Sequence, residues 1–213
     1  MRQSLSYPAS WTFIARLVSY IFHPLLVGVY MAVYMIYINP VYYNYIDPRD
    51  KILSLATVFN NNFVFPFVVV LLLKGLGFIK SIYLDTAKER IVPYMASIIF
   101  FFWTWYVFYN KPDAPPAMKD MLQGIFYSSI MAMTANIYFK ISMHAIGMGG
   151  LIGMMLMVLF DGMMLSGLPF VISILLTGLV MTSRLIASDH EKGDIAAGFL
   201  AGFLSQVLAA TIL

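Results

Sequence analysis

Long apolar runs separated by short polar segments make up most of the chain. Window hydropathy places these runs at about 11 to 38, 53 to 76, 92 to 109, 121 to 139, 145 to 165, 168 to 184 and 195 to 213. A helix needs about 20 apolar residues to cross about 30 Å of hydrocarbon, and most of the runs are near that length. The pattern therefore predicts an all-α protein, a polytopic bundle of six or seven transmembrane helices that forms a single integral-membrane domain over residues 1–213.

The composition agrees with a membrane protein and excludes several kinds of chemistry. Of the 213 residues, 61% are hydrophobic and 11% are charged, whereas about 25% are charged in a typical soluble domain. The net charge of +3 is too small, and the basic residues too scattered, to indicate a nucleic-acid partner. The chain has no cysteine, which excludes disulfides, thiolate metal sites and cysteine nucleophiles.

The few ionisable residues gather in three segments that the predicted topology places at one membrane face. The most informative segment runs from Ser183 to Asp194, between the last two apolar runs. On a helix, His190 and Asp194 share a face, so the carboxylate can accept a hydrogen bond from one imidazole nitrogen while the other nitrogen faces a substrate. Arg184 can present its planar guanidinium to two phosphate oxygens. Because charges are costly in hydrocarbon, this gathering indicates a functional site.

The other two segments add an acid, a hydroxyl and two cations. Ser142 and His144 precede the Gly-rich stretch 145–150, and a hydroxyl, an imidazole and the N–H groups of a helix start suit an anion. Lys88 and Arg90 stand just ahead of another apolar run, where they also fit interfacial anchoring. Together the three segments predict an anion site with a nucleophile and a proton donor.

The pattern S-R-x5-H-x3-D is met in full by Ser183, Arg184, His190 and Asp194. It resembles the third signature motif of the type 2 phosphatidic acid phosphatases, a superfamily of membrane lipid phosphatases related to vanadium haloperoxidases. The resemblance covers about residues 85–200.

The first two motifs of that family are matched in part. For P-S-G-H, the segment Ile141-Ser142-Met143-His144 supplies the serine and the histidine. For K-x6-R-P, the chain supplies the residue types at a different spacing, as Lys88, Arg90 and Pro93.

The resemblance implies an integral-membrane hydrolase that removes phosphate from a lipid phosphate or diphosphate. His190 would attack phosphorus to form a phosphohistidine, Asp194 would orient it, and His144 would protonate the leaving alkoxide. The phosphoryl oxygens would be bound by Arg184, Ser142, Ser183, Lys88 and Arg90. No metal and no cofactor is implied, because the cations take the place of Mg²⁺. The implied partners are the lipid substrate and membrane lipids, in a bacterial inner (cytoplasmic) membrane.

Other interpretations stay open. The protein could be a catalytically silent relative that keeps the bundle and the anion pocket for lipid binding or transport. Haem or metal ligation by His144 and His190 is less favoured, because neighbouring Arg and Lys side chains repel a cation. His23-Pro24 predicts a buried histidine bonded to a carbonyl freed by the proline, and Asn60–Asn62 predict hydrogen bonds between helices.

The distribution of Lys and Arg predicts the orientation. Nine of these residues fall on the side of the N-terminus and of the three segments, and four fall on the other side. By the positive-inside rule, the candidate site faces the cytoplasm.

Overall fold

The computed structural model describes residues 7–82, 84, 86–187 and 190–212, which form helices and no strand. The helices are α1 (Ala9–Ile21), α2 (Pro24–Val33), α3 (Pro40–Tyr43), α4 (Pro48–Phe59), α5 (Phe65–Gly75), α6 (Ala87–Tyr109), α7 (Pro116–Tyr138), α8 (Met143–Phe160), α9 (Leu168–Ala187) and α10 (Lys192–Ile212), with two π-helical segments, η1 (Tyr34–Ile38) and η2 (Asn60–Val64).

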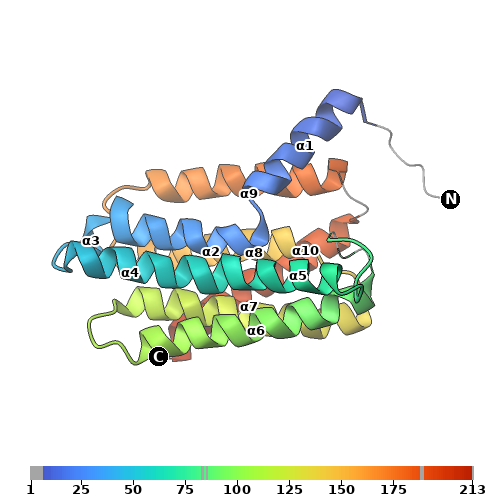
Figure 1. Cartoon of the computed structure of the whole chain (residues 1–213). Coiled ribbons are helices and arrows are strands. Elements are labelled where there is room, and N and C mark those ends of the chain that lie inside the picture. The colour runs from blue at the N-terminus through green and yellow to red at the C-terminus, as the bar shows by residue number, and fades with distance from the viewer. Residues whose placement is uncertain (1–6, 83, 85, 188–189, 213) are drawn as a thin grey trace.

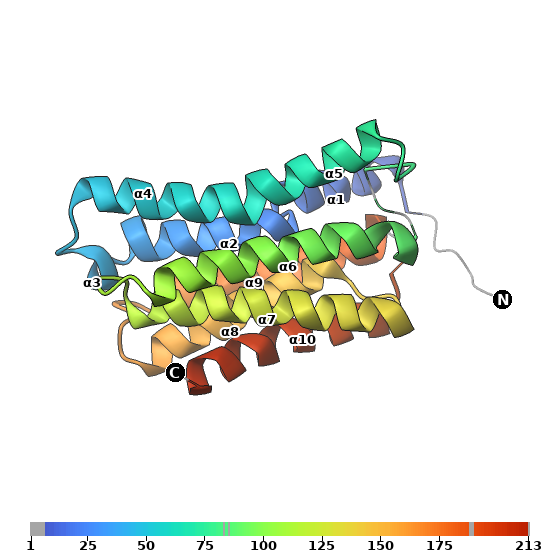
Figure 2. The same ribbon diagram turned by 60° about the horizontal axis from the view of Figure 1, so that its bottom comes forward.

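The long helices lie side by side in one bundle, and α1 is tilted out of it (Figures 1 and 2). Helix α8 packs against α10, α9 and α2, while α7 packs between α6 and α10. Helix α1 packs on α9. The starts of α6, α8 and α10 and the end of α9 lie at the same end of the bundle, as the predicted topology requires (Figure 1).

The chain is an integral membrane protein by the length and composition of its helices. Among the described residues, five helical stretches are long and apolar enough to cross a membrane: Pro48–Gly75, Ala87–Tyr109, Met143–Phe160, Leu168–Ala187 and Lys192–Ile212. The bent pair α1 and α2–η1 would be a sixth span. The predicted fourth span, at 121 to 139, is helical as α7 (Pro116–Tyr138) but is not among these candidates. The first turns of α7 carry Lys119, Asp120 and Gln123.

The run predicted as one span at 11 to 38 is bent by 56° where α1 meets α2. His23 is the N-cap of α2, and its Nδ1 accepts a hydrogen bond from the backbone N–H of Leu25 at 3.3 Å. Pro24 takes the first helical position, where its missing N–H costs nothing. The prediction that His23 bonds a carbonyl freed by Pro24 was therefore wrong, because this nitrogen accepts and caps a new helix.

Helix α8 ends earlier than the apolar run at 145 to 165. After the C-cap Asp161, Gly162 has a φ of +67°, and the N–H of Met163 bonds the carbonyl of Val158 at 3.2 Å. The N–H of Gly162 also bonds Leu159 at 3.2 Å. These two bonds form a Schellman motif, which stops a helix whatever the hydropathy of the residues that follow.

Glycines bring α8 and α10 into backbone contact. A Cβ on Gly149 would collide with the backbone of Phe199, and a Cβ on Gly202 would collide with the backbone of Ile146. Small residues permit such close approach of membrane helices. The contact fixes the start of α8, which carries Ser142 and His144, against the start of α10, which carries Asp194.

Asn62 confirms the expectation of hydrogen bonds between helices. It lies in η2, and its Oδ1 accepts a hydrogen bond from the hydroxyl of Thr104 on α6 at 3.2 Å. Asn61 instead bonds the carbonyl of Thr57 within its own helix.

Candidate anion site at one end of the bundle

The segment that begins at Ser142 and the segment that carries Arg184, His190 and Asp194 meet where α8, α9 and α10 converge. The backbone N–H of Ser142, the N-cap of α8, donates to the carbonyl of Asp194 in the first turn of α10 at 3.2 Å. Arg184 lies in the last turn of α9, directly before the connection that carries His190. Two segments about forty residues apart in sequence therefore form one cluster, as the sequence predicted.

His190 and Asp194 form the predicted pair. Nδ1 of His190 lies 3.4 Å from Oδ2 of Asp194, and their side chains are 10% and 21% exposed. The same Oδ2 accepts the backbone N–H of Glu191 at 3.0 Å, as in the carboxylate half of a capping box. A carboxylate can only accept, so Nδ1 carries the proton and Nε2 is left with a lone pair.

The surroundings of His190 favour its neutral form. Burial lowers the pKa of its imidazole, and the positive charges of Lys140 and Arg184 lower it further, against the opposing effect of Asp194. A lowered pKa keeps the Nε2 lone pair available at neutral pH and below. The pair thus has the geometry and the charge state of an oriented nucleophile or base.

His144 lies in the first turn of α8 and faces α1. Its Nε2 is 3.0 Å from the backbone carbonyl of Ser19, which requires the proton on Nε2 because a carbonyl only accepts. Its ring centroid is 6.0 Å from that of His23 in an edge-on arrangement. The guanidinium of Arg184 and the imidazole of His190 lie within electrostatic range of His144.

Arg184 is held at the centre of the cluster by α1. Its Nη1 donates to the hydroxyl of Ser19 at 3.1 Å, and the hydroxyls of Ser19 and Ser183 are 3.3 Å apart. Ser19 and Ser183 are both buried. One fixed cation therefore stands near His23, His144 and His190, an arrangement that favours an anion among them.

The two predicted serine ligands have structural contacts. Ser142 is fully buried, and its Oγ accepts the N–H of Ala145 at 3.4 Å as the cap of α8. The hydroxyl of Ser183 donates to the carbonyl of Val180 at 2.7 Å. Ser188 and Asp189, between Arg184 and His190, lie outside the described residues.

The segment that contains Lys88 and Arg90 forms the first turn of α6. Thr86 and Glu89 form a capping box, and Arg90 donates from Nε to the carbonyl of Leu84 at 2.8 Å. Lys88 is exposed. Arg90 precedes by one turn Tyr94, whose hydroxyl donates to the sulfur of Met143 at 2.8 Å. The segment thus borders the second motif through Tyr94, while Lys88 and Arg90 are not placed among the histidines by a described hydrogen bond.

Two residues of the cluster were not predicted, Ser19 and His23. Ser19 bonds both Arg184 and His144, and His23 lies beside His144. The available signal was the pair His23-Pro24 in the middle of a long apolar run, since a polar residue followed by proline is a typical start of a new helix. A broken span with a polar residue at the break often marks a site inside the bilayer.

Metal binding by the histidines is the other chemistry that the sequence left open. Among the described residues, no three His, Asp or Glu side chains are close enough together to hold a metal ion. Arg184 lies within electrostatic range of His144 and His190, the two histidines considered as metal ligands from the sequence, and its charge would repel a metal cation. Comparisons of the chain with family models, curated proteins and solved structures find no match.

Proposed function

We propose that the protein is an integral-membrane phosphatase that hydrolyses a lipid phosphate or diphosphate through a phosphohistidine. The observation that carries the proposal is the meeting of the complete S-R-x5-H-x3-D pattern with a second histidine. His190 is oriented by Asp194 at 3.4 Å, and Arg184 stands close to both His190 and His144. The resemblance to the type 2 phosphatidic acid phosphatases supports the same reaction.

The first step transfers the phosphoryl group to the enzyme. Nε2 of His190 attacks phosphorus, a P–N bond forms, and the P–O bond to the lipid alkoxide breaks. Asp194 stabilises the positive charge that develops on the imidazole through Nδ1. His144, protonated on both ring nitrogens for this step, delivers the Nδ1 proton to the leaving oxygen, while its Nε2–H stays bonded to the carbonyl of Ser19. Arg184 stabilises charge on the phosphoryl oxygens.

The second step returns the enzyme to its starting state. A water molecule attacks the phosphohistidine, gives its proton to His144, and releases inorganic phosphate as the P–N bond breaks. The two half-reactions need a nucleophile, one group that gives and then takes back a proton, and one fixed cation. His190, His144 and Arg184 supply these functions without a metal ion.

Release of inorganic phosphate from purified protein in detergent tests the proposal. Phosphatidic acid, phosphatidylglycerol phosphate and a polyprenyl diphosphate form a suitable panel of substrates. We expect release from at least one of them, unchanged by EDTA and lost in His190→Ala but not in the exposed control Lys192→Ala. Binding of these lipids without release would favour a silent lipid-binding protein, and loss of activity in EDTA restored by Mg²⁺ would favour a metal-dependent hydrolase.

A further inference from the structure

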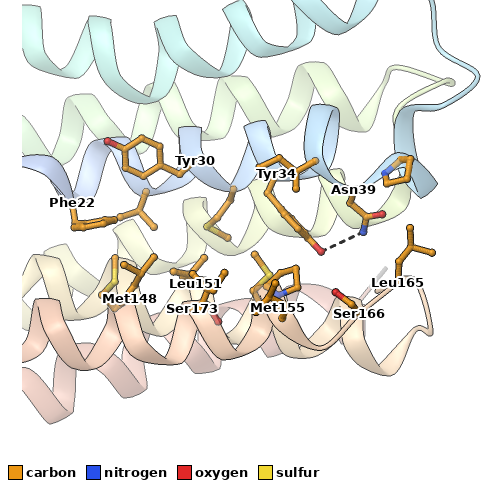
Figure 3. Close-up of a pocket in the computed structure, with 18 residues that line it drawn as sticks. Phe22, Tyr30, Tyr34, Asn39, Met148, Leu151, Met155, Leu165, Ser166 and Ser173 are labelled. Carbon is orange, nitrogen blue, oxygen red and sulfur yellow. Dashed lines mark hydrogen bonds between the residues drawn. The ribbon is translucent and has the colours of Figure 1, made fainter.

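An apolar groove runs along the bundle from the anion site towards the opposite membrane face. It lies between α2–η1 on one side and α8 and α9 on the other, with a volume of about 570 Å³. Figure 3 shows Phe22 and Met148 at one end, Tyr34 and Met155 further along, and Asn39 at the other end. This volume falls within the range of about 300–1,000 Å³ that is usual for small-molecule sites.

Residues at the nearer end of the groove are neighbours in the chain of anion-site residues, although no anion-site residue itself lines the groove. Phe22 adjoins His23 in sequence, and Met148 follows His144 by one turn on the same face of α8. On α9, Leu176 lines the groove about two turns before Arg184. All three walls of the groove therefore lead to the cluster of histidines and Arg184.

Asn39, Leu165 and Ser166 border the far end of the groove (Figure 3). The side-chain nitrogen of Asn39 donates to the carbonyl of Met163 at 3.0 Å, which joins the end of η1 to the α8–α9 connection. From Val27 to Ile38, the α2–η1 wall is about 16 Å long at 1.5 Å per residue. This is roughly half of the 30 Å hydrocarbon thickness, the depth of one leaflet.

We infer that this groove binds one hydrocarbon chain of the lipid substrate while the phosphate occupies the anion site. The inference rests on the proposed function for the identity of the headgroup. Among the described residues that line the groove, none is charged, whereas the end next to His23 carries the cation and the imidazoles. An amphiphile with an anionic head and an apolar chain matches this division in both polarity and order.

Photo-cross-linking tests the groove in the unmodified protein without any need for turnover. The probes are a phosphatidic acid and a phosphatidylcholine that carry the same diazirine-labelled acyl chain. We expect the phosphatidic acid to label groove residues such as Ile172 and to be displaced by excess unlabelled phosphatidic acid. Phosphatidylcholine should instead spread over the lipid-facing surface. Equal labelling patterns for the two probes would overturn the inference.

A matched pair of variants on α9 tests the groove by kinetics. Ile172 lines the groove and is 46% exposed, while Ile174 is 48% exposed and lies on the opposite face of the helix. Because a tryptophan in the groove displaces several methylenes of the chain, we expect Ile172→Trp to lower kcat/KM for dipalmitoyl phosphatidic acid about tenfold. Dibutanoyl phosphatidic acid should be hydrolysed within about twofold of wild type, as should both substrates by Ile174→Trp.

The outcomes separate the groove from the chemistry. Equal loss of activity towards both chain lengths in Ile172→Trp, or phosphate release with no preferential labelling of the groove, would overturn the groove alone. Displaceable labelling of the groove without phosphate release would overturn the proposed phosphatase and retain the groove as a lipid-phosphate site.

Discussion

His190 and Asp194 show how one local hydrogen bond sets the chemistry of a side chain. The carboxylate faces Nδ1 at 3.4 Å and is itself fixed by the N–H of Glu191 at 3.0 Å. The imidazole is therefore oriented by the first turn of α10. The orientation places the proton on Nδ1, so Nε2 is the atom that can act as a nucleophile.

Loss of the orienting carboxylate should slow turnover while leaving the fold intact. We expect Asp194→Asn to lower kcat by about 10² to 10⁴ fold, because the amide favours the wrong tautomer of His190. The measurement is the rate of phosphate release at saturating lipid, with the melting temperature as a control for folding. A rate within twofold of wild type would show that Asp194 does not orient the nucleophile.

The dependence of activity on pH should report the environment of His190. Burial, Lys140 and Arg184 lower its pKa below the ordinary value of 6.5, so the neutral nucleophile persists to lower pH. The acid limb of kcat/KM should accordingly lie below pH 6.5. Removal of one positive charge in Lys140→Gln should raise the pKa and move this limb to higher pH. A limb that stays in place, or moves to lower pH, would contradict the assignment.

The packing of α8 on α10 determines whether the start of α8, at Ser142, lies against Asp194 in the first turn of α10. At Gly149 and Gly202 the backbones are too close to admit a Cβ, whereas a Cβ on Gly178 of α9 would have no neighbouring atom within 4 Å. A larger residue at the contact would separate the helices and move Ser142 away from Asp194. Gly149 and Gly202 therefore help to hold Ser142 and Asp194 in place by allowing α8 and α10 to pack closely.

Alanine substitutions should distinguish a glycine that the α8–α10 contact requires from a glycine in open space. Gly202→Ala should lower the free energy of unfolding by about 1–3 kcal/mol through overpacking and should also reduce phosphate release. Gly178→Ala, in open space within a helix, should be neutral or stabilise by up to about 1 kcal/mol. Thermal unfolding in detergent measures both, and equal melting temperatures for the two variants would contradict the close packing.

Much of the helix pattern could be predicted from the sequence, but the breaks could not. Hydropathy located the apolar runs because a membrane helix needs about 20 apolar residues in succession. It missed the bend at His23 and the end of α8 at Gly162, since both depend on backbone hydrogen bonds and a positive φ.

The site was predictable to the extent that its residues are local in sequence. Spacing alone placed His190 and Asp194 on one face, and the structure confirms that pairing. Ser19 and His23 could not be assigned, because their role depends on how α1 packs against α9 and α8. The predicted roles of Ser142 and Ser183 as ligands did not include the helix contacts that their hydroxyls make.

The distribution of charge along the whole molecule predicts its orientation in the membrane. The end of the bundle that carries the site holds most of the Lys and Arg, and the α6–α7 connection lies at the other end (Figure 1). By the positive-inside rule, we expect the site to face the cytoplasm.

Cysteine labelling in intact cells tests this orientation, because the chain has no cysteine of its own. Lys192→Cys, at the exposed start of α10, should resist a membrane-impermeant maleimide until the cells are permeabilised. Asp113→Cys, in the exposed α6–α7 connection, should be labelled in intact cells. The reverse pattern would place the site on the outer face and leave its chemistry unchanged.

The most direct test of the central claim is capture of the covalent intermediate. Purified protein is mixed with phosphatidic acid labelled in its phosphate, quenched within milliseconds in base, and digested for mass spectrometry. We predict an acid-labile, base-stable phosphoryl group on His190 that forms and decays at rates compatible with turnover and is absent from His190→Ala. Steady phosphate release with no label on His190, or undiminished release by His190→Ala, would contradict the account.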